Sequence, residues 1–248
     1  MKIDPQPAFE KRWRRRFEEY ALRFDDDAGI AGWSPSGLDA RLRHFAQAWS
    51  GAISNAQWLD VGCGAGSYTR YLMASGVKVL GLDYSYPSLK KARGRKGGEG
   101  ATWAVGDATR LPVASKSFDG ALCFGVLQAL SRPDDALREL HDCLKDGGEL
   151  WVDALNAYCL PTLIQRLRAR MRGLPMHLRY DSPWQLARSM RNTGLSEVKL
   201  HWVPIVPMRL AKFQPLFESA PLRVLIKFIP FLGALISHAF VLSGRRRG

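Results

Sequence analysis

The stretch Leu59-Asp60-Val61-Gly62-Cys63-Gly64-Ala65-Gly66-Ser67 places three glycines directly after an apolar run. The residues that follow it, up to Met73, are typical of a helix, so the stretch predicts a strand, a tight glycine turn and a helix. Glycine allows the backbone to approach a ligand closely, and the first amides of a helix carry partial positive charge. Asp83 ends a second apolar run, where a carboxylate can accept both hydroxyls of a ribose. Together these features predict a site for a nucleoside-bearing cofactor.

The glycine spacing distinguishes between cofactors. A dinucleotide fingerprint reads G-x-G-x-x-G/A, whereas here the third glycine comes one residue early and Ser67 stands at the dinucleotide position. An acidic residue, Asp60, also precedes the first glycine by two positions. The resulting [DE]-x-G-x-G-x-G pattern resembles the first motif of class I S-adenosylmethionine-dependent methyltransferases.

Further motifs continue this resemblance in the family's order. Val105-Gly106-Asp107-Ala108 is similar to the end of the third strand, residues 117–124 to the fourth strand, and residues 137–150 to the helix and glycine turn before the fifth. The chain is thus similar to the small-molecule and lipid methyltransferases of the type 11 group. The resemblance implies an α/β fold, a three-layer αβα Rossmann-like doubly wound sheet of order 3-2-1-4-5-7-6 with an antiparallel seventh strand. It also implies S-adenosyl-L-methionine as the cofactor.

The resemblance implies roles for the residues of the glycine turn. The backbone at Gly62, Gly64 and Gly66, with Cys63 among them, would pass against the methionine and ribose portions of the cofactor. Asp60 would stand near the cofactor's ammonium group. The alternative for the carboxylates at strand ends is that they cap turns.

Residues after the next three strands would complete the cofactor site. Asp83 would accept the ribose hydroxyls, with Tyr84 beside the adenine. Asp107 would receive the adenine amine, with Ala108 next to it, and Phe124 would sit close to the reacting sulfur.

Alternating periodicities predict the order of elements. Strands are expected near 56–61, 77–82, 101–105, 118–124, 148–155, 195–203 and 237–244, and helices near 66–75, 85–94, 133–144 and 182–193. Before them, aromatic residues recur every three to four positions over 8–24, which predicts an amphipathic helix. A second helix is expected to be capped by Ser36 or Asp39 and to run to about Trp49.

These elements predict three parts of one chain. The resemblance implies that residues 1–50 form an N-terminal helical lid. The alternative is that the aromatic stripe over 8–24 serves only packing. Residues 51–156 form the Rossmann-like cofactor core. Residues 157–248 belong to the same domain and carry two insertions on the substrate side, 157–180 and 205–236.

The C-terminal part holds most of the net charge of +13, because residues 151–248 carry 15 Lys and Arg against 4 Asp and Glu. The charge indicates either solvated arginines or an anionic partner. Residues 157–172 predict a basic amphipathic helix. Residues 205–236 mix large apolar residues with Arg209, Lys212, Arg223 and Lys227, which suits either an interfacial helix pair on an acidic membrane or the roof of the substrate pocket. The uncharged run 228–244 is too short for a membrane span.

The sequence says less about the residues that would bind the methyl acceptor. The stretch Val126-Leu127-Gln128-Ala129-Leu130 lacks the histidine that related small-molecule enzymes carry there, and no Asn/Asp-Pro-Pro-Tyr/Phe signature follows the fourth strand. His177 and Tyr180 could enter a pocket, so the catalytic base is unknown. Four cysteines without metal-ligand spacing predict reduced thiols and no metal site. Reduced thiols predict a cytoplasmic location, and a peripheral position at the membrane is the alternative.

These observations favour an enzyme that transfers a methyl group to an oxygen or carbon of a small or lipid-like acceptor. One alternative is an RNA-associated methyltransferase that uses the basic C-terminal part. Nucleic acid is disfavoured, because the cations alternate with aliphatic rather than aromatic residues. The other alternative is a cofactor-binding protein without methyl transfer. The oligomeric state is not determined by these patterns.

Overall fold

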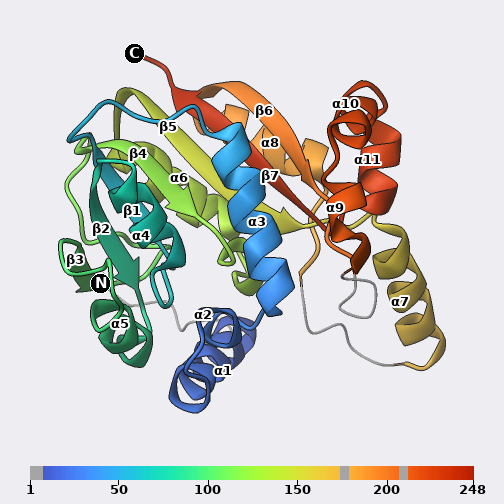
Figure 1. Cartoon of the computed structure of the whole chain (residues 1–248), viewed down its shortest axis with the longest axis horizontal. Helices are drawn as coiled ribbons and strands as arrows, with labels where there is room; N and C mark the ends of the chain where they lie inside the picture. Colours follow the sequence, from blue (N-terminus) through green and yellow to red (C-terminus); the bar gives the residue numbers. More distant parts are fainter. Residues whose placement is uncertain (1–7, 174–178, 207–211) are drawn as a thin grey trace.

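Among the residues that the structure describes, 8–173, 179–206 and 212–248, seven strands form one sheet of order β3-β2-β1-β4-β5-β7-β6. The structure is a computed structural model of the chain (Figure 1). Strands β1 to β5 run parallel, and β7 is antiparallel to both β5 and β6. The strand order and the antiparallel seventh strand confirm the prediction. The strands are Gln57–Val61 (β1), Lys78–Asp83 (β2), Thr102–Val105 (β3), Phe118–Cys123 (β4), Leu144–Leu155 (β5), Leu195–Val203 (β6) and Ala239–Arg246 (β7).

Helices cover both faces of this sheet, and other helices project beyond it (Figure 1). The helices are Ala8–Arg23 (α1), Asp27–Ile30 (α2), Pro35–Ala48 (α3), Ser67–Ala74 (α4), Tyr86–Arg93 (α5), Pro133–Cys143 (α6), Leu160–Met171 (α7), Pro183–Asn192 (α8), Gln214–Phe217 (α9), Ala220–Phe228 (α10) and Pro230–Ile236 (α11), with a 3₁₀ turn at Leu127–Ala129. Helices α3 and α4 lie on one face, and α6 and α8 on the other, as expected for alternating strands and helices.

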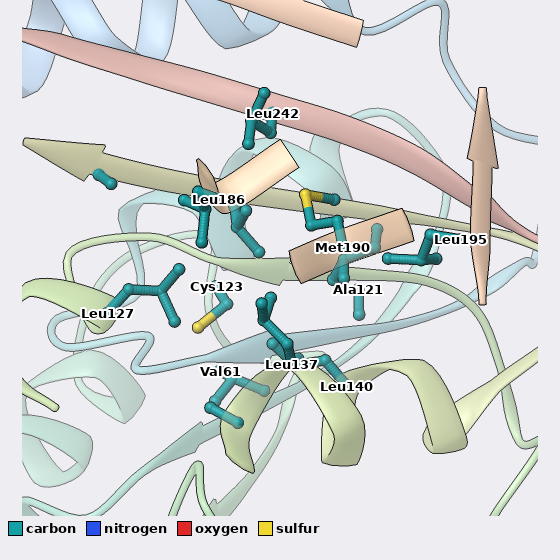
Figure 2. Close-up of a cluster of buried hydrophobic side chains, with 14 of the residues drawn as sticks. Val61, Ala121, Cys123, Leu127, Leu137, Leu140, Leu186, Met190, Leu195 and Leu242 are labelled. Atoms are coloured by element: carbon teal, nitrogen blue, oxygen red, sulfur yellow. The ribbon is translucent and has the colours of Figure 1, made fainter. Parts of the chain in front are cut away.

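Each face has its own apolar core. The core shown in Figure 2 lies between the sheet and helices α6 and α8, where Leu137, Leu140 and Met190 are completely buried. On the opposite face, the Phe45 ring of α3 lies 5.3 Å from the Trp151 ring and 5.6 Å from the Phe124 ring. The second core therefore joins α3 to the ends of β4 and β5, next to the predicted cofactor site.

The starts of α3 and β5 differ from the sequence-based expectation. The cap of α3 is Ser34, whose hydroxyl accepts a hydrogen bond from Gly37 N at 3.1 Å, and not Ser36 or Asp39. The earlier start follows from Pro35, which suits the first turn of a helix. Strand β5 begins at Leu144, because Leu144 pairs with Phe118 before the register shifts to Gly120 and Glu149. The glycine turn expected at this point is thus an irregularity inside the strand.

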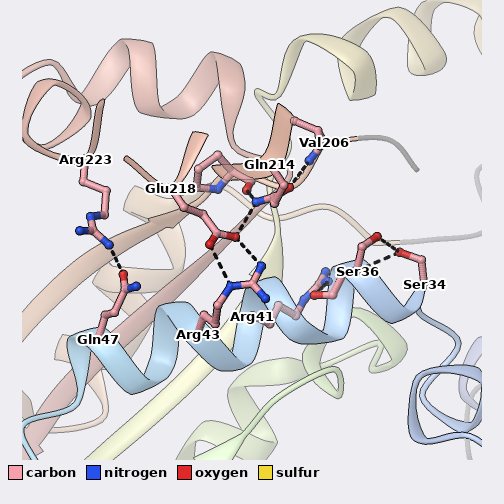
Figure 3. A network of polar contacts seen from close by, with 11 residues as sticks. Ser34, Ser36, Arg41, Arg43, Gln47, Val206, Gln214, Glu218 and Arg223 are labelled. Atoms are coloured by element: carbon pink, nitrogen blue, oxygen red, sulfur yellow. Dashed lines mark hydrogen bonds and ion pairs between the residues drawn. The ribbon is translucent and has the colours of Figure 1, made fainter. Parts of the chain in front are cut away.

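The insertion before β7 is fastened to α3 by polar contacts (Figure 3). Both guanidinium donors of Arg43 contact Glu218, at 2.9 and 2.8 Å, and Arg223 donates to Gln47. Gln214 adds hydrogen bonds to Pro204 O and Glu218, at 2.8 Å each. These contacts hold α9 and the start of α10 against the body of the fold.

The apolar run 228–244 divides into two elements. Helix α11 ends at Ile236, where Ser237 N donates back to Gly233 O, and β7 begins at Ala239. In the described part of the chain, no helix combines the length and apolar character that crossing a bilayer requires.

Candidate cofactor and acceptor site

A pocket lies beyond the carboxyl ends of β1 to β4, where open parallel sheets bind ligands. The empty space within it, including the open solvent at its mouth, is about 1010 Å³. Among the described residues, those that line it lie between Glu10 and Leu130. Helices α1 and α2 contribute side chains to it.

Two glycines of the β1–α4 turn line the pocket for different reasons. Gly62 has φ 74°, and a Cβ there would stand 2.1 Å from Val126 Cγ2, so packing excludes a side chain. Gly64 has φ 53°, and a Cβ there would meet no protein atom within 4 Å. Because Gly64 borders the pocket, its bare backbone leaves a cradle in which a ligand can approach the main chain.

Gly66 differs from the other predicted cofactor-binding residues, because it is absent from the pocket lining. It precedes α4 with φ 79°, and a Cβ there would lie 2.6 Å from Trp103 Cη2. This third glycine therefore allows close packing between the turn and β3. Asp60, Gly62, Cys63, Gly64, Asp83, Tyr84, Asp107, Ala108 and Phe124 all line the pocket.

Asp83 is held rigidly at the end of β2. Its Oδ2 accepts from Gly64 N and its Oδ1 from Ser85 N, both at 2.8 Å. Burial raises the pKa of Asp83, and the backbone hydrogen bonds from Ser85 and Gly64 oppose this shift. A carboxylate has about four acceptor sites. Asp83 can therefore still accept two hydroxyls from a ligand in the cradle.

Asp60 and Cys63 lie deeper in the same wall. Asp60 Oδ2 accepts from the Thr69 hydroxyl at 2.6 Å, and burial raises the pKa of Asp60 to about 6. Burial also raises the pKa of the Cys63 thiol, as do the charges of Asp83 and Asp60. The thiol stays protonated and is therefore a weak nucleophile.

At the third-strand end, α1 covers Asp107. Asp107 Oδ1 accepts from the Thr109 amide at 2.8 Å and from its hydroxyl at 2.7 Å, while Oδ2 forms an ion pair with Arg14. The Arg14 guanidinium lies 5.1 Å from the centre of the Tyr84 ring. Burial raises the pKa of Asp107, but the hydrogen bonds from Thr109 and the charge of Arg14 outweigh it and lower the pKa overall. Asp107 is thus an ionised acceptor closed over by the lid.

The other end of the pocket is aromatic and aliphatic. The Tyr68 and Phe124 rings meet edge to face at 4.8 Å, and Trp33, Leu38 and Val126 complete the wall. The Tyr68 hydroxyl is buried without a hydrogen-bond partner in the described chain. Burial and the nearby charge of Asp153 raise the pKa of Tyr68, so its hydroxyl is a donor and not a base.

Charged residues support this apolar end from behind. Asp153 Oδ1 accepts from Gly125 N at 2.6 Å, and Asp153 also pairs with Arg41 Nε at 3.5 Å. The Arg41 guanidinium lies 4.3 Å from the centre of the Trp33 ring. Neither charged group lines the pocket, so the pair fixes the positions of Gly125 and Trp33.

Sequence reasoning missed the contribution of α2. Asp26 caps this short helix, and Asp27 accepts from the Ser67 hydroxyl at 2.6 Å and pairs with Arg70. The run Asp25-Asp26-Asp27 lies between the two N-terminal helices that the sequence predicts, where no further helix is expected. No sequence pattern distinguishes Asp27, Trp33 and Ser34 from ordinary loop residues.

Of the two remaining acceptor-side candidates, Tyr180 is absent from the pocket lining. The other, His177, lies outside the described residues. The described residues contain no group of three or more His, Cys, Asp or Glu side chains that could hold a metal ion.

Known proteins share this fold and these motifs. Residues 59–152 match the family described as "Methyltransferase domain". A ubiquinone biosynthesis O-methyltransferase of Chromobacterium violaceum is 30% identical over 174 residues, which are 65% of this chain and 71% of that protein. A malonyl-[acyl-carrier protein] O-methyltransferase of Pseudescherichia vulneris is 27% identical over 246 residues, 88% of this chain and 94% of that protein. The chain belongs to the S-adenosylmethionine-dependent methyltransferases.

Solved structures agree in fold. A phosphoethanolamine N-methyltransferase 2 of Haemonchus contortus, in complex with phosphomonomethylethanolamine and S-adenosylhomocysteine, has a TM-score of 0.68 at 18% identity. The likeness covers 99% of this chain and 62% of that one. The chain spans only 30–60% of the length of several other curated relatives that it matches.

Proposed function

We propose that this protein transfers a methyl group from S-adenosylmethionine to an oxygen or carbon of a small, largely apolar acceptor. The observation that carries the proposal is a single pocket with carboxylates at one end and aromatic side chains at the other. Asp83 and Asp107 suit the ribose and the adenine amine, whereas Phe124, Tyr68 and Trp33 suit an apolar acceptor. The names of the two O-methyltransferase relatives agree with transfer to an oxygen.

The cradle at Gly64 and the free acceptor sites of Asp83 fit the cofactor. S-adenosylmethionine supplies a methyl group on a positively charged sulfur, which leaves as a neutral thioether. The chain then has to orient the two reactants and exclude water. Asp83 would fix the ribose, Asp60 would face the ammonium group, and Gly62 and Cys63 would form the wall between them.

The acceptor end offers aromatic and aliphatic surface, with the rings of Tyr68, Phe124 and Trp33 in its wall. We assign no role to the Tyr68 hydroxyl, which is buried without a hydrogen-bond partner in the described chain. We assign no catalytic base. Residues 1–50 would act as the lid, 51–156 as the cofactor core and 157–248 as the remainder of the same domain.

The test is transfer of labelled methyl groups from S-adenosylmethionine to a panel of acceptors. The panel contains demethylated quinones, malonyl thioesters and simple phenols, and Asp83→Asn serves as the variant with weakened cofactor binding. Transfer to one of these acceptors, reduced in that variant at limiting S-adenosylmethionine, supports the proposal. Tight binding of S-adenosylhomocysteine with no transfer to any member would contradict it and favour a cofactor-binding protein of another function.

A further inference from the structure

Helix α7 is almost uncovered by the rest of the molecule. The structure describes all 12 of its residues, and only Thr162 is buried. An isolated helix of this length is marginal in water, because most helical stability comes from packing one apolar face. The outer end shows the lack of packing most clearly, since Met171 is 79% exposed.

The exposed residues of α7 are ordered by type around the helix. Large apolar side chains recur at the i, i+3, i+4, i+7 and i+11 positions of one face: Leu160, Leu163, Ile164, Leu167 and Met171. At 100° per residue, Arg168 and Arg170 fall on opposite borders of this stripe, and Arg166 falls beyond Arg170. Arg172, the C-cap that follows the helix, falls beyond Arg168. We call Arg166, Arg168, Arg170 and Arg172 the four α7 arginines. Residues 157–173 contain no Asp or Glu. The helix therefore presents an apolar face with cations on both sides.

A second exposed apolar site is the junction between α10 and α11. The four consecutive residues Phe228, Ile229, Pro230 and Phe231 are exposed, with Phe228 at 78% and Phe231 at 70%. The opposite sides of the two helices face inward, because Ile226 is buried and Gly233 packs against the Trp202 indole. No acidic residue occurs from 219 to 248.

The two sites are tied together at their bases. Asn156 Nδ2 donates to Ala234 O and Ser237 O, each at 2.7 Å, and its Oδ1 accepts from Tyr158 N at 3.0 Å, two residues before α7 begins. Figure 1 shows α7, α10 and α11 on the same side of the molecule, away from α4 and α5. None of these three helices lines the pocket, so their apolar faces do not roof it.

We propose that α7 and the α10–α11 junction form a surface that docks the protein on an anionic lipid bilayer. The apolar stripe and the two phenylalanines would enter the boundary of the acyl chains, and the arginines would lie among the acidic headgroups. Each cation near such a surface contributes attraction that salt screens. An apolar stripe with cations at its edges and a second, separate apolar projection suit a deformable lipid surface better than the continuous complementary face of a protein partner. The proposal does not depend on methyl transfer.

Vesicle co-sedimentation of the full chain tests this docking surface. The probes are vesicles of phosphatidylcholine alone and of phosphatidylcholine with phosphatidylglycerol, each at low and high salt. We expect binding to the acidic vesicles at low salt and a loss of about ten-fold or more at high salt. Equal recovery in the supernatant with both vesicle types at low salt would overturn the proposal.

Two pairs of matched variants locate the surface. Leu167→Ser, Met171→Ser, Phe228→Ser and Phe231→Ser together should abolish vesicle binding, whereas Leu22→Ser with Ile53→Ser, at similarly exposed positions, should leave it unchanged. Replacing the four α7 arginines with Gln should weaken binding about ten-fold or more. Replacing the exposed Arg12, Arg15, Lys90 and Lys96 with Gln, an equal loss of charge, should weaken it far less.

Unchanged affinity for S-adenosylhomocysteine shows that each variant is folded. Equal effects of both members of a pair would mean that net charge or general apolarity binds the vesicles, which would contradict a defined surface. An acidic carrier protein that binds through the four α7 arginines, together with no binding to acidic vesicles, would replace the membrane by a protein partner.

Discussion

Each carboxylate oxygen of Asp83 accepts one hydrogen bond from a backbone amide, which leaves further acceptor sites for a ligand. Asp83→Asn removes the charge and turns an NH₂ group toward one of the two amides. We expect the affinity for S-adenosylhomocysteine to fall by about 1.5–3 kcal/mol, the range for hydrogen bonds to a charged group. Isothermal titration calorimetry measures the change.

Asp119→Asn is the matched control for this variant. Asp119 also accepts from a strand amide, Gln57 N, at 2.8 Å, but it does not line the pocket. Wild-type affinity in Asp83→Asn would remove Asp83 from the site.

Asp60 makes stability depend on pH. Its pKa is raised in the folded chain to about 6, so folding favours the protonated form. The stabilisation is complete below the ordinary pKa near 3.8 and is lost as the pH rises through about 6. Asp60→Asn cannot ionise, and its side-chain oxygen can still accept from Thr69. The variant should therefore gain stability relative to the wild type over this window, by up to about 3 kcal/mol.

Urea unfolding of both proteins from pH 4 to pH 8 measures this difference. A constant difference across the series would show that Asp60 has an ordinary pKa in the folded chain.

The sequence predicts the site residues that belong to motifs but not those of the lid. Asp83 and Asp107 follow directly from strand ends, because the carboxyl ends of parallel strands meet at one edge. Trp33 and Asp27 reach the pocket through the packing of α2 against the glycine turn. That packing depends on tertiary contacts, which local periodicity does not encode. Gly66, in contrast, belongs to the motif but does not line the pocket. Its missing side chain allows close packing with Trp103.

At the scale of elements, α1 competes with the cofactor for one carboxylate. Arg14 occupies the Asp107 oxygen that the adenine amine would use. Both side chains are about one-third exposed, so the ion pair contributes only about 0–1 kcal/mol. Arg14→Ala should therefore raise the affinity for S-adenosylhomocysteine by up to about five-fold, as measured by calorimetry.

Arg15→Ala, on the exposed side of α1, is the control and should leave the affinity unchanged. Weaker binding in Arg14→Ala would mean that Arg14 contacts the cofactor and that no exchange of partners takes place.

Elements with strong local signals were predicted closely, and irregular ones were not. The α6 boundaries follow from Pro133 at the first turn and the two acidic residues after it. The early start of β5 at Leu144 was missed, because it depends on pairing with Phe118 across the sheet. Strand β7 begins two residues later than expected, at Ala239, because Ser237 is the C-cap of α11 and its N donates to Gly233 O.

At the scale of the whole molecule, charge and site are separated along the chain. Residues 51–150 carry 12 basic against 11 acidic residues, and the described residues that line the pocket all come before 131. The excess of positive charge lies after residue 150, where α7, α10 and α11 stand. Cofactor binding should thus respond little to salt, in contrast to the attraction of the basic surface for acidic lipids.

Ligand binding in the pocket should stabilise the entire fold, because the pocket joins the lid to the ends of four strands. A ligand that binds only the folded chain stabilises it by about 2.7 kcal/mol at 100 times its dissociation constant. For a chain of this size, each kcal/mol raises Tm by roughly 2–4 °C, so S-adenosylhomocysteine should raise Tm by about 5–11 °C. Nicotinamide dinucleotide at the same concentration should leave Tm unchanged, because the third glycine lies one residue too early for a pyrophosphate turn. Differential scanning fluorimetry with both ligands measures the effect. A shift with the dinucleotide equal to that with S-adenosylhomocysteine would contradict the assignment of the glycine turn, and Asp83→Asn should lose most of the genuine shift.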